Sequence, residues 1–360
     1  MSWIISVLVL GTLVLVHELG HFLVARWSGV RVTSFSIGFG PKLWGWKRGG
    51  TEYIVSALPL GGYVKMAGEH RSERQAHADE FLSQPPGVRA RIIVAGPLVN
   101  YLTSIVSLWV VLVIGYPELL PTVGRLIDGM PAKAAGFVVG DRITAIDGHA
   151  VKTWDEMTKL VHESANHPLA FAVTRAGASL TMTVTPQAKT ITDPFGRSRA
   201  VGLVGIAPDS EAFEPYRVGP IEAIGKMAEK QLEWTTQIGL SLWSLATGRI
   251  SPKDSLTGPI GIIYMTSEAA RMGLGSLLYL VSVFSLSLAI FNLFPIPILD
   301  GGHLLFVVLE KLRGRPVSMN VQERATQVSL ALLLTMVALV CLNDLSRFGL
   351  VSKFLGLWKG

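Results

Sequence analysis

The sequence has few charged residues and almost no cysteine. Only 16% of its 360 residues are charged and 49% are hydrophobic, whereas a soluble globular domain carries about 25% charged residues. This composition excludes an ordinary soluble protein, and we expect part of the chain to lie in lipid. The single cysteine, Cys341, excludes an internal disulfide and indicates nothing about the compartment.

Four apolar runs are long enough, or nearly so, to span a membrane, which takes about 20 residues. They are residues 4–25, 92–115, 277–299 and 328–342, and the last run needs its polar flanks to reach that length. The first run is not a cleavable signal peptide, because it lacks a basic start and carries histidines where the cleavage site should be. The sequence predicts a polytopic α-helical membrane protein with about four transmembrane helices.

The chain is basic, with a formal net charge of +6. Such a charge fits nucleic-acid binding, but in a membrane protein it marks cytoplasmic loops instead. Lys and Arg cluster between the first and second runs and between the third and fourth. We therefore expect these two loops in the cytoplasm, and both termini and the long segment between the second and third runs outside. We also expect contact with membrane lipid and no nucleic-acid partner.

The segment from Val32 to Met66 alternates β-forming residues with Gly and Pro. This pattern predicts short β-hairpins and a glycine-bounded loop. Its many aromatic residues favour a small sheet at the membrane surface.

From about Thr122 to Pro208 the pattern is that of a soluble α/β domain. Strands, a small-residue helix turn, a turn at Asp147-Gly148 and a helix from Trp154 to about Ser164 are expected in that order, followed by strands near 171–175 and 180–185. Residues 131–136, with Gly140, Asp141 and Asp147-Gly148, resemble a PDZ domain of the protease-associated kind; a generic α/β domain is the alternative. The proline-containing ends, 117–121 and 208–220, predict flexible connections.

Apolar residues then recur at helical spacing from Ile221 to Leu245, with Glu and Lys between them. They predict an amphipathic helix in the outer membrane interface. A helix packed on the soluble domain is the alternative.

The first apolar run contains three ionisable residues where each is costly. His17 and His21 are four residues apart, so a helix presents them on one face, where they can hold one metal ion. Glu18 lies one position round, close enough to touch a water on that metal but not to ligate it. A buried histidine is more often a satisfied core residue, but three ionisable groups in a spanning helix favour a functional site. The pattern predicts zinc near the cytoplasmic face, with Glu18 as the catalytic residue.

Zinc with two histidines needs a third protein ligand. The third run ends in Ala289–His303, where Pro295 and Pro297 break the helix. Broken backbone at such depth lines a cavity or is buried in protein. Asp300 is expected at the depth of the two histidines and is our predicted third ligand. His303 is the alternative ligand, and helix capping is the alternative role of Asp300.

The two motifs together resemble the site-2 protease family of intramembrane zinc metalloproteases. They are HELGH in the first run and Asn292-x-x-Pro295-x-Pro297-x-Leu299-Asp300-Gly301 in the third. The chain resembles the bacterial regulator-of-sigma-E protease branch, with one evident PDZ domain where well-known members carry two. The resemblance extends to Gly38-Phe39-Gly40-Pro41, Gly96-Pro97 with Asn100, and Gly258-Pro259.

This resemblance implies peptide-bond hydrolysis in the membrane, with Zn²⁺ as cofactor and with Asn292, Pro295 and Pro297 contacting the substrate. Helix capping is the alternative role of Asn292. The implied substrates are single-span membrane proteins, notably anti-sigma factors trimmed beforehand by an upstream site-1 type protease, and remnant signal peptides. The implied location is the bacterial inner membrane, with the PDZ domain outside. There it would bind a new carboxy terminus or exclude untrimmed ectodomains.

Two functions without proteolysis fit parts of the sequence. A membrane metal or ion transporter also has broken helices and intramembrane carboxylates, but the two halves of this chain show no internal repeat. A PDZ membrane scaffold with a structural metal site would not need Glu18 beside the ligands.

The expected order along the chain has nine segments. They are the first span (1–26), a cytoplasmic-side β-hairpin region (27–90), the second span (91–116), the PDZ domain (117–209), an amphipathic helix and linker (210–276), the third span (277–303), a cytoplasmic loop (304–326), the fourth span (327–346) and a tail (347–360).

Overall fold

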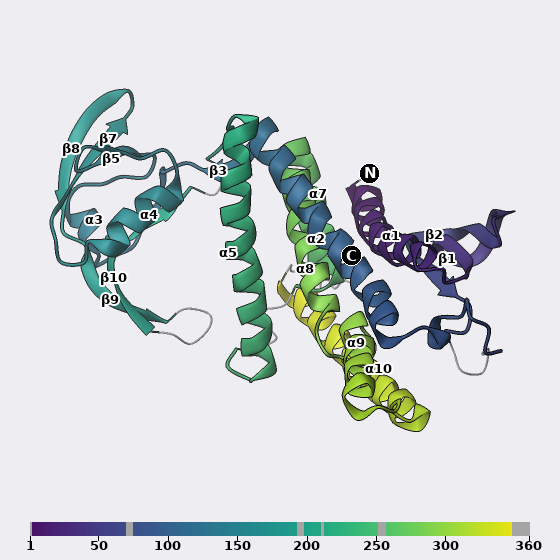
Figure 1. Cartoon of the computed structure of the whole chain (residues 1–360). Helices are drawn as coiled ribbons and strands as arrows, with labels where there is room; N and C mark the ends of the chain where they lie inside the picture. The colour runs from purple at the N-terminus through teal and green to yellow at the C-terminus, as the bar shows by residue number, and fades with distance from the viewer. Residues whose placement is uncertain (1, 70–74, 193–197, 210–211, 251–256, 348–360) are drawn as a thin grey trace, which may run out of the picture. The chain divides into compact units, whose positions relative to one another are not determined.

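The computed structural model describes residues 2–69, 75–192, 198–209, 212–250 and 257–347 (Figure 1). Internal contacts divide the chain into two units. The first unit comprises Met1–Val111, Ile224–Leu242 and Ser251–Gly360, and the second comprises Leu112–Ala223 and Trp243–Ile250. Most of the expected tail lies outside the described residues.

Four helices are long and apolar enough to cross a membrane, which confirms the predicted number. They are α1 (Ser2–Trp27), α2 (Pro86–Ile114), α8 (Leu274–Asn292) and α10 (Met319–Arg347). Three boundaries differ from expectation by five residues or more. Helix α2 begins at Pro86 rather than at 91, because proline suits the first turn of a helix. Helix α8 ends at Asn292, before the two prolines, rather than at 303, and α10 begins at Met319 rather than at 327.

Shorter helices complete the first unit. Helix α7 (Pro259–Met272) packs against α1, α8 and α10, and a short 3₁₀ helix, η2 (Phe81–Ser83), precedes α2. Helix α9 (Asp300–Arg313) occupies much of the segment expected to be a cytoplasmic loop, and it ends at the left-handed Gly314. This part of the predicted cytoplasmic connection is therefore helical, with apolar residues recurring along an amphipathic helix, and its side of the membrane stays a prediction.

Two long strands, β1 (Val32–Arg48) and β2 (Thr51–Met66), form one folded-back hairpin. Residues 34–37 of β1 pair on both sides, with residues 62–65 and with residues 52–55 of β2. Residues 42–48 pair with residues 51–56, so the sheet has four rows, and residues 62–66 form one outer row. The register shifts near Gly38 and Gly40, whose φ angles of 92° and 86° suit glycine. The expected loop and separate short hairpins are thus a single continuous sheet.

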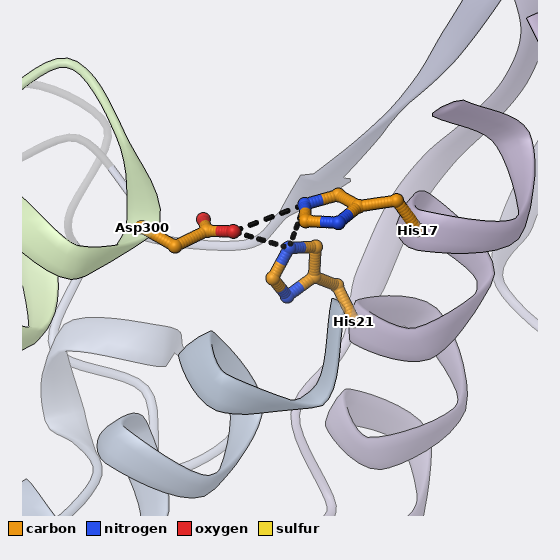
Figure 2. A group of neighbouring side chains, drawn as sticks. All are labelled: His17, His21 and Asp300. Carbon is orange, nitrogen blue, oxygen red and sulfur yellow. Dashed lines mark hydrogen bonds and ion pairs between the residues drawn. The ribbon is translucent and has the colours of Figure 1, made fainter. Parts of the chain in front are cut away.

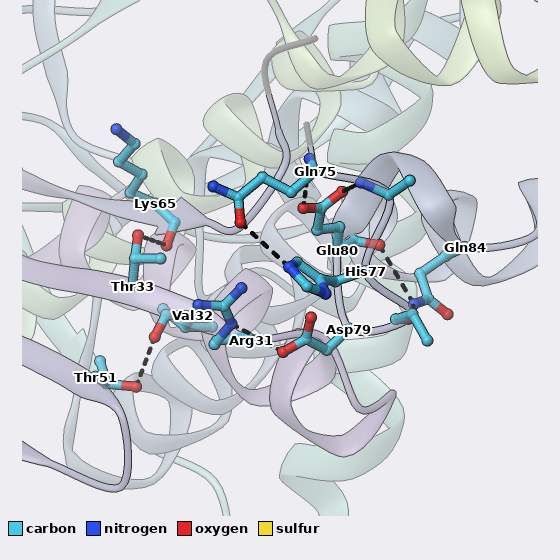
Figure 3. Close-up of polar contacts among 12 residues, drawn as sticks. Arg31, Val32, Thr33, Thr51, Lys65, Gln75, His77, Asp79, Glu80 and Gln84 are labelled. Carbon is cyan, nitrogen blue, oxygen red and sulfur yellow. Dashed lines mark hydrogen bonds and ion pairs between the residues drawn. The ribbon is translucent and has the colours of Figure 1, made fainter. Parts of the chain in front are cut away.

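Polar contacts fix the base of this hairpin (Figure 3). The Arg31 guanidinium donates to Asp79 Oδ2 at 2.8 Å, and the Arg31 backbone N–H donates to the Asp79 carbonyl at 2.9 Å. The buried Glu80 carboxylate accepts the backbone N–H groups of Gln75 and Ala76. The two Arg31–Asp79 bonds tie the segment before α2 to the start of β1, and the Glu80 bonds hold that segment in shape.

The middle of helix α5 (Pro220–Ala246) contacts the spans of the first unit. Thr235 Oγ1 lies 3.3 Å from the Tyr101 hydroxyl of α2, and Ser104 of α2 donates to Gln231 Oε1 at 3.2 Å. Trp234 packs edge-on against Tyr279 of α8. The amphipathic helix thus pairs its polar groups with serine and tyrosine of the spans, whereas the sequence led us to expect the membrane interface or the soluble domain.

The second unit contains the soluble domain. Its four-stranded sheet has the order β6-β5-β7-β8, and two helices, α3 and α4, accompany it. Two-stranded pairs form between β4 and β11 and between β9 and β10. The bounds are β4 (Val123–Leu126), α3 (Pro131–Ala134), β5 (Arg142–Ile146), β6 (His149–Ala150), α4 (Trp154–Glu163), β7 (Leu169–Arg175), β8 (Ala178–Val184), β9 (Gln187–Thr192), β10 (Ser198–Leu203) and β11 (Ile206–Pro208).

Buried apolar side chains from these elements form one core around Phe171, Ile143 and Val173, each fully buried. The predicted Asp147-Gly148 turn is present, with φ angles of 47° and 79° as a tight hairpin turn requires. Asp141 is buried and accepts two hydrogen bonds from the Arg175 guanidinium, at 2.7 and 2.8 Å. This ion pair joins the start of the sheet to the end of β7.

The two ends of the soluble domain pair with each other. Strand β3 (Tyr116–Leu119) forms an antiparallel ladder with β12 (Phe213–Tyr216). The Asp209 N–H also donates to the Thr122 carbonyl at 3.0 Å. The described parts of both ends are therefore paired rather than flexible, because β-forming residues flank the prolines and a two-stranded ladder can tolerate proline at its edges, while residues 210–211 lie outside the described residues.

Candidate metal centre

Helix α1 presents His17 and His21 on the face that packs against α2. The two helices approach closely at Gly20 and Gly96, where a Cβ on Gly20 would lie 2.5 Å from the Ala95 carbonyl oxygen. A Cβ on Gly96 would lie 2.3 Å from His21 Nε2. Glycine at both positions therefore leaves the space that the two imidazole rings occupy.

Asp300 is positioned by the irregular stretch between α8 and α9. Four backbone N–H groups of residues 293–299 bond to nearby carbonyls, including Leu299 N–H to the Ile296 carbonyl at 2.8 Å, so the break in the helix leaves most of these donors paired. Gly301 and Gly302 lie against this stretch; a Cβ on either would meet its backbone at 2.2–2.3 Å. The first turn of α9 is thus packed directly on the stretch that contains Pro295 and Pro297, and this packing aims Asp300 at α1.

The three predicted ligand side chains come together (Figure 2). His17 Nε2 and His21 Nε2 lie 3.0 and 3.4 Å from Asp300 Oδ2, and the two Nε2 atoms lie 3.1 Å apart. Both histidines are buried, with 7% of each residue exposed. Three donor atoms from two helices therefore converge on one point inside the first unit.

The chemistry of these donors fits a zinc ion. Donors about 2.0–2.1 Å from a tetrahedral zinc stand about 3.3 Å apart, which agrees with the separations of 3.0–3.4 Å. The Ile92 carbonyl lies 2.8 Å from His21 Nδ1 and can only accept, so Nδ1 carries the hydrogen and Nε2 presents a lone pair. Asp300 Oδ2 is buried without a hydrogen bond among the described residues. A cation would satisfy these facing lone pairs.

Glu18 lies beside this group and does not belong to it. Its carboxylate Oε2 accepts a hydrogen bond from the Val64 backbone N–H at 3.1 Å, which ties α1 to the outer row of the hairpin. The carboxylate is thus next to the two histidines in α1 but is held by the hairpin backbone. A general base that is not a metal ligand needs such a position.

The other residues singled out in the sequence have different surroundings. His303, the alternative ligand, is exposed on α9 and is not part of the group. Asn292 is the last residue of α8, and Pro295 and Pro297 lie in the irregular stretch that follows. These three positions border the segment that carries Asp300, which is where the sequence led us to expect substrate contacts.

Three residues of α2 contact the histidines, although sequence reasoning gave them no role in the site. They are Ile92, Gly96 and Asn100. The sequence did mark Gly96-Pro97 and Asn100 as part of the family resemblance. A buried polar residue in an apolar run, such as Asn100, was the available signal.

Comparisons with known proteins identify the family and its cofactor. The model of peptidase family M50 matches residues 5–336. A protein of Rhizobium meliloti, named as a candidate zinc metalloprotease, is 36% identical over 351 residues, with 93% of each chain covered. The regulator of sigma-E protease RseP of Salmonella typhimurium is 31% identical over 446 positions, with 95% of this chain and 97% of that protein covered. That alignment is longer than this chain, so the Salmonella protein has segments without a counterpart here.

A solved PDZ domain, from an SdrC-like protein of Listeria monocytogenes, aligns with 25% of this chain and 87% of its own length. The identity is 23% and the TM-score is 0.20. At that score the likeness carries no argument about the fold, and the PDZ assignment of the soluble domain stays a prediction.

Proposed function

The chain belongs to peptidase family M50 and is an intramembrane zinc metalloprotease, and from this premise we propose how its residues act and what it cleaves. His17, His21 and Asp300 hold the zinc ion, and Glu18 is the general base. The observation that carries this assignment is the convergence of three donor atoms within 4.8 Å of one another, with a carboxylate beside them that is not a ligand.

The chain's own groups divide the work of hydrolysis. Bound zinc supplies a Lewis acid that activates water and polarises the scissile carbonyl. The Glu18 carboxylate takes the proton from the attacking water and later delivers it to the leaving amine. The hydrogen bond from Val64 keeps this carboxylate next to the histidines during both transfers.

A substrate helix must unwind before its peptide bonds can be reached. The outer row of the hairpin, residues 62–66, runs beside Glu18, and an extended segment can add along its outer edge through backbone groups other than the N–H groups of Val64 and Met66, which bond to Glu18 and Glu69. Asn292, at the broken end of α8, offers an amide to the substrate backbone, and Pro295 and Pro297 shape the stretch opposite. These features support a site that binds its substrate as a strand.

The proposed substrates are transmembrane segments of single-span membrane proteins. Anti-sigma factors already trimmed by an upstream site-1 type protease, and remnant signal peptides, are the two classes that the family relationship favours. We further infer that the soluble domain is a PDZ domain outside the membrane, and that it controls access rather than catalysis, since none of its described residues belongs to the metal-binding group.

The orientation follows from charge. The basic residues around β1, β2, α9 and the start of α10 favour the cytoplasmic side for those segments. This orientation places both termini and the soluble domain outside, in a bacterial inner membrane. Leu43 and Trp44 of the hairpin are 69% and 63% exposed, which suits contact with lipid.

The test is metal analysis together with cleavage by protein purified in detergent. We expect about one zinc per chain and hydrolysis of a pre-trimmed single-span substrate. His17→Ala and Asp300→Ala should both lose zinc and activity, whereas His303→Ala should keep both. Full zinc retention in the first two variants would refute the ligand assignment, and loss of zinc in His303→Ala would favour the alternative ligand.

A further inference from the structure

Asn100 is a buried polar side chain on the α2 face that contacts the metal group. It is fully buried, and its amide lies 3.4 Å from His17 Nδ1, the ring nitrogen that faces away from Asp300. A polar side chain at this position is costly unless it is hydrogen-bonded. The contact with His17 is therefore a reason for an amide at this point in an apolar helix.

The proposed role of His17 as a metal ligand decides which end of this amide faces its ring. With Nδ2 toward His17, the buried Oδ1 has no partner among the described residues. The oxygen and nitrogen of an amide have nearly the same shape, and the surrounding network fixes their order. Turning the amide over brings Oδ1 to His17 Nδ1 as an acceptor and moves the amide nitrogen to the place where the oxygen had no partner among the described residues. This order requires a hydrogen on Nδ1, so Nε2 is left with a lone pair.

His21 shows the same arrangement with a backbone acceptor. Its Nδ1 lies 2.8 Å from the Ile92 carbonyl, also on α2. One helix thus accepts a hydrogen from the outer nitrogen of each histidine and leaves both Nε2 atoms free for the metal. Such outer partners fix the tautomer and the ring orientation of metal-binding histidines, and losing one typically weakens metal binding about 10- to 100-fold.

The geometry points to Asn100 as a positioning residue for zinc: its carbonyl oxygen holds His17 in the tautomer that presents Nε2 to the ion. This role rests on the proposed function, because it takes His17 as a ligand. The Asn100 backbone is fixed too, since Ser285 Oγ of α8 donates to its carbonyl at 2.8 Å. The side chain therefore acts from a rigid support.

Three variants test this role on the full-length protein in detergent. Asn100→Leu removes the acceptor at similar volume. Asn100→Asp keeps an acceptor and removes the amide donor. Ser104→Ala is the matched control, because Ser104 is equally buried on α2 and bonds to Gln231 and Ser282 without contacting a histidine. The measurements are zinc affinity by chelator competition and the visible spectrum of the cobalt-substituted protein.

We expect about 10- to 100-fold weaker zinc binding in Asn100→Leu, with an altered cobalt spectrum. Asn100→Asp should bind zinc within a few-fold of the wild type, and so should Ser104→Ala. Wild-type affinity in Asn100→Leu would overturn the proposal. So would equal weakening in Asn100→Asp, which would mean that the amide donates to His17 instead.

The failure of this inference is distinguishable from the failure of the proposed function. If the wild type binds zinc and His17→Ala does not, the ligand assignment stands whatever Asn100 does. If His17→Ala keeps zinc, the ligand assignment fails, and the role of Asn100 fails with it.

Discussion

The Glu18 carboxylate and the Val64 backbone N–H are joined by a hydrogen bond of 3.1 Å. Glu18 belongs to the helix that carries the two histidines, and Val64 belongs to the outer row of the hairpin. The proposed base therefore touches the edge on which we expect the substrate to bind. The Val64 N–H is taken up by the base, so a substrate strand must pair with other backbone groups of that row.

Replacing Glu18 by glutamine should separate chemistry from metal binding. The amide oxygen can still accept from Val64, so the site should keep its shape, but it cannot take a proton from water. We expect cleavage to fall by about 10²- to 10⁴-fold while the zinc content stays at the wild-type value. Single-turnover cleavage and metal analysis measure the two effects. Cleavage at the wild-type rate would exclude Glu18 as the base.

Gly96→Ala should damage the metal site from the neighbouring helix. The added Cβ would lie 2.3 Å from His21 Nε2, and relieving such overpacking costs about 1–3 kcal/mol. We expect weaker zinc binding than in the wild type, measured by chelator competition. Gly87→Ala is the control. Gly87 is also on α2, and a Cβ there would have no atom of another segment within 4 Å. Equal zinc affinity in both variants would contradict the packing argument.

The Asp141–Arg175 pair should make the soluble domain sensitive to acid. Hydrogen bonds from Arg175 hold the pKa of Asp141 below its usual value, against the opposing effect of burial. The pair therefore stabilises the domain at neutral pH and loses its effect as the pH falls below about 4, where the unfolded carboxyl starts to bind protons. At pH 7, Asp141→Asn should lower the free energy of unfolding by about 1.5–3 kcal/mol.

Hydrogen exchange of peptides from residues 169–184 measures this difference in the full-length protein. The gap between Asp141→Asn and the wild type should shrink when both are compared at pH values below about 4. Asp128→Asn is the control, since Asp128 pairs with Lys133 on the exposed surface and such pairs contribute little. A gap that does not change with pH would show that the effect of Asp141 does not depend on its charge.

Orientation in the membrane is testable with one cysteine. Ser179 is exposed on β8 and tolerates a substitution of similar size. In a chain with Cys341→Ala, Ser179→Cys should react with a membrane-impermeant thiol reagent in cells whose outer membrane is permeabilised. Labelling that appears only after lysis of the inner membrane would reverse the proposed topology.

Removing the soluble domain should relax selectivity and leave the metal centre intact. The Asp209 N–H bonds to the Thr122 carbonyl, so the two ends of residues 122–209 meet and a short linker can replace the segment. The β3–β12 ladder remains in such a deletion. We expect zinc content and cleavage of a pre-trimmed span to persist, and an untrimmed substrate to become cleavable. Loss of cleavage for both substrates, with zinc retained, would indicate an essential docking domain instead.

The local parts of the site were predictable from the sequence. His17, Glu18 and His21 lie within five residues of one another, and helical spacing alone fixes which side chains share a face. Asp300 required one more step, because the prolines indicated where the third span ends. The structure brings Asp300 to the two histidines. The spacing of residues in the first span could not by itself identify the third ligand.

The features of the site and of the hairpin that the sequence did not predict depend on contacts between segments far apart in the chain. The role of Gly96 follows from the close approach of α1 and α2, and that of Asn100 from the ring nitrogen opposite it. Neither follows from neighbours in sequence. The hairpin is similar: β-forming residues were evident, but pairing of residues 34–37 on both sides depends on register shifts near two glycines. Sequence period does not specify such a register.

Two serine hydroxyls join α2 to α8: Ser282 donates to the Ser104 carbonyl at 2.9 Å, and Ser285 donates to the Asn100 carbonyl at 2.8 Å. Parting these helices in hydrocarbon would break both bonds and leave each hydroxyl only the carbonyls of its own helix as partners. The α2–α8 seam is therefore a poor lateral gate. A substrate helix that leaves the lipid should reach the metal centre from another side. Cross-linking α2 to α8 should therefore leave the rate of substrate cleavage unchanged.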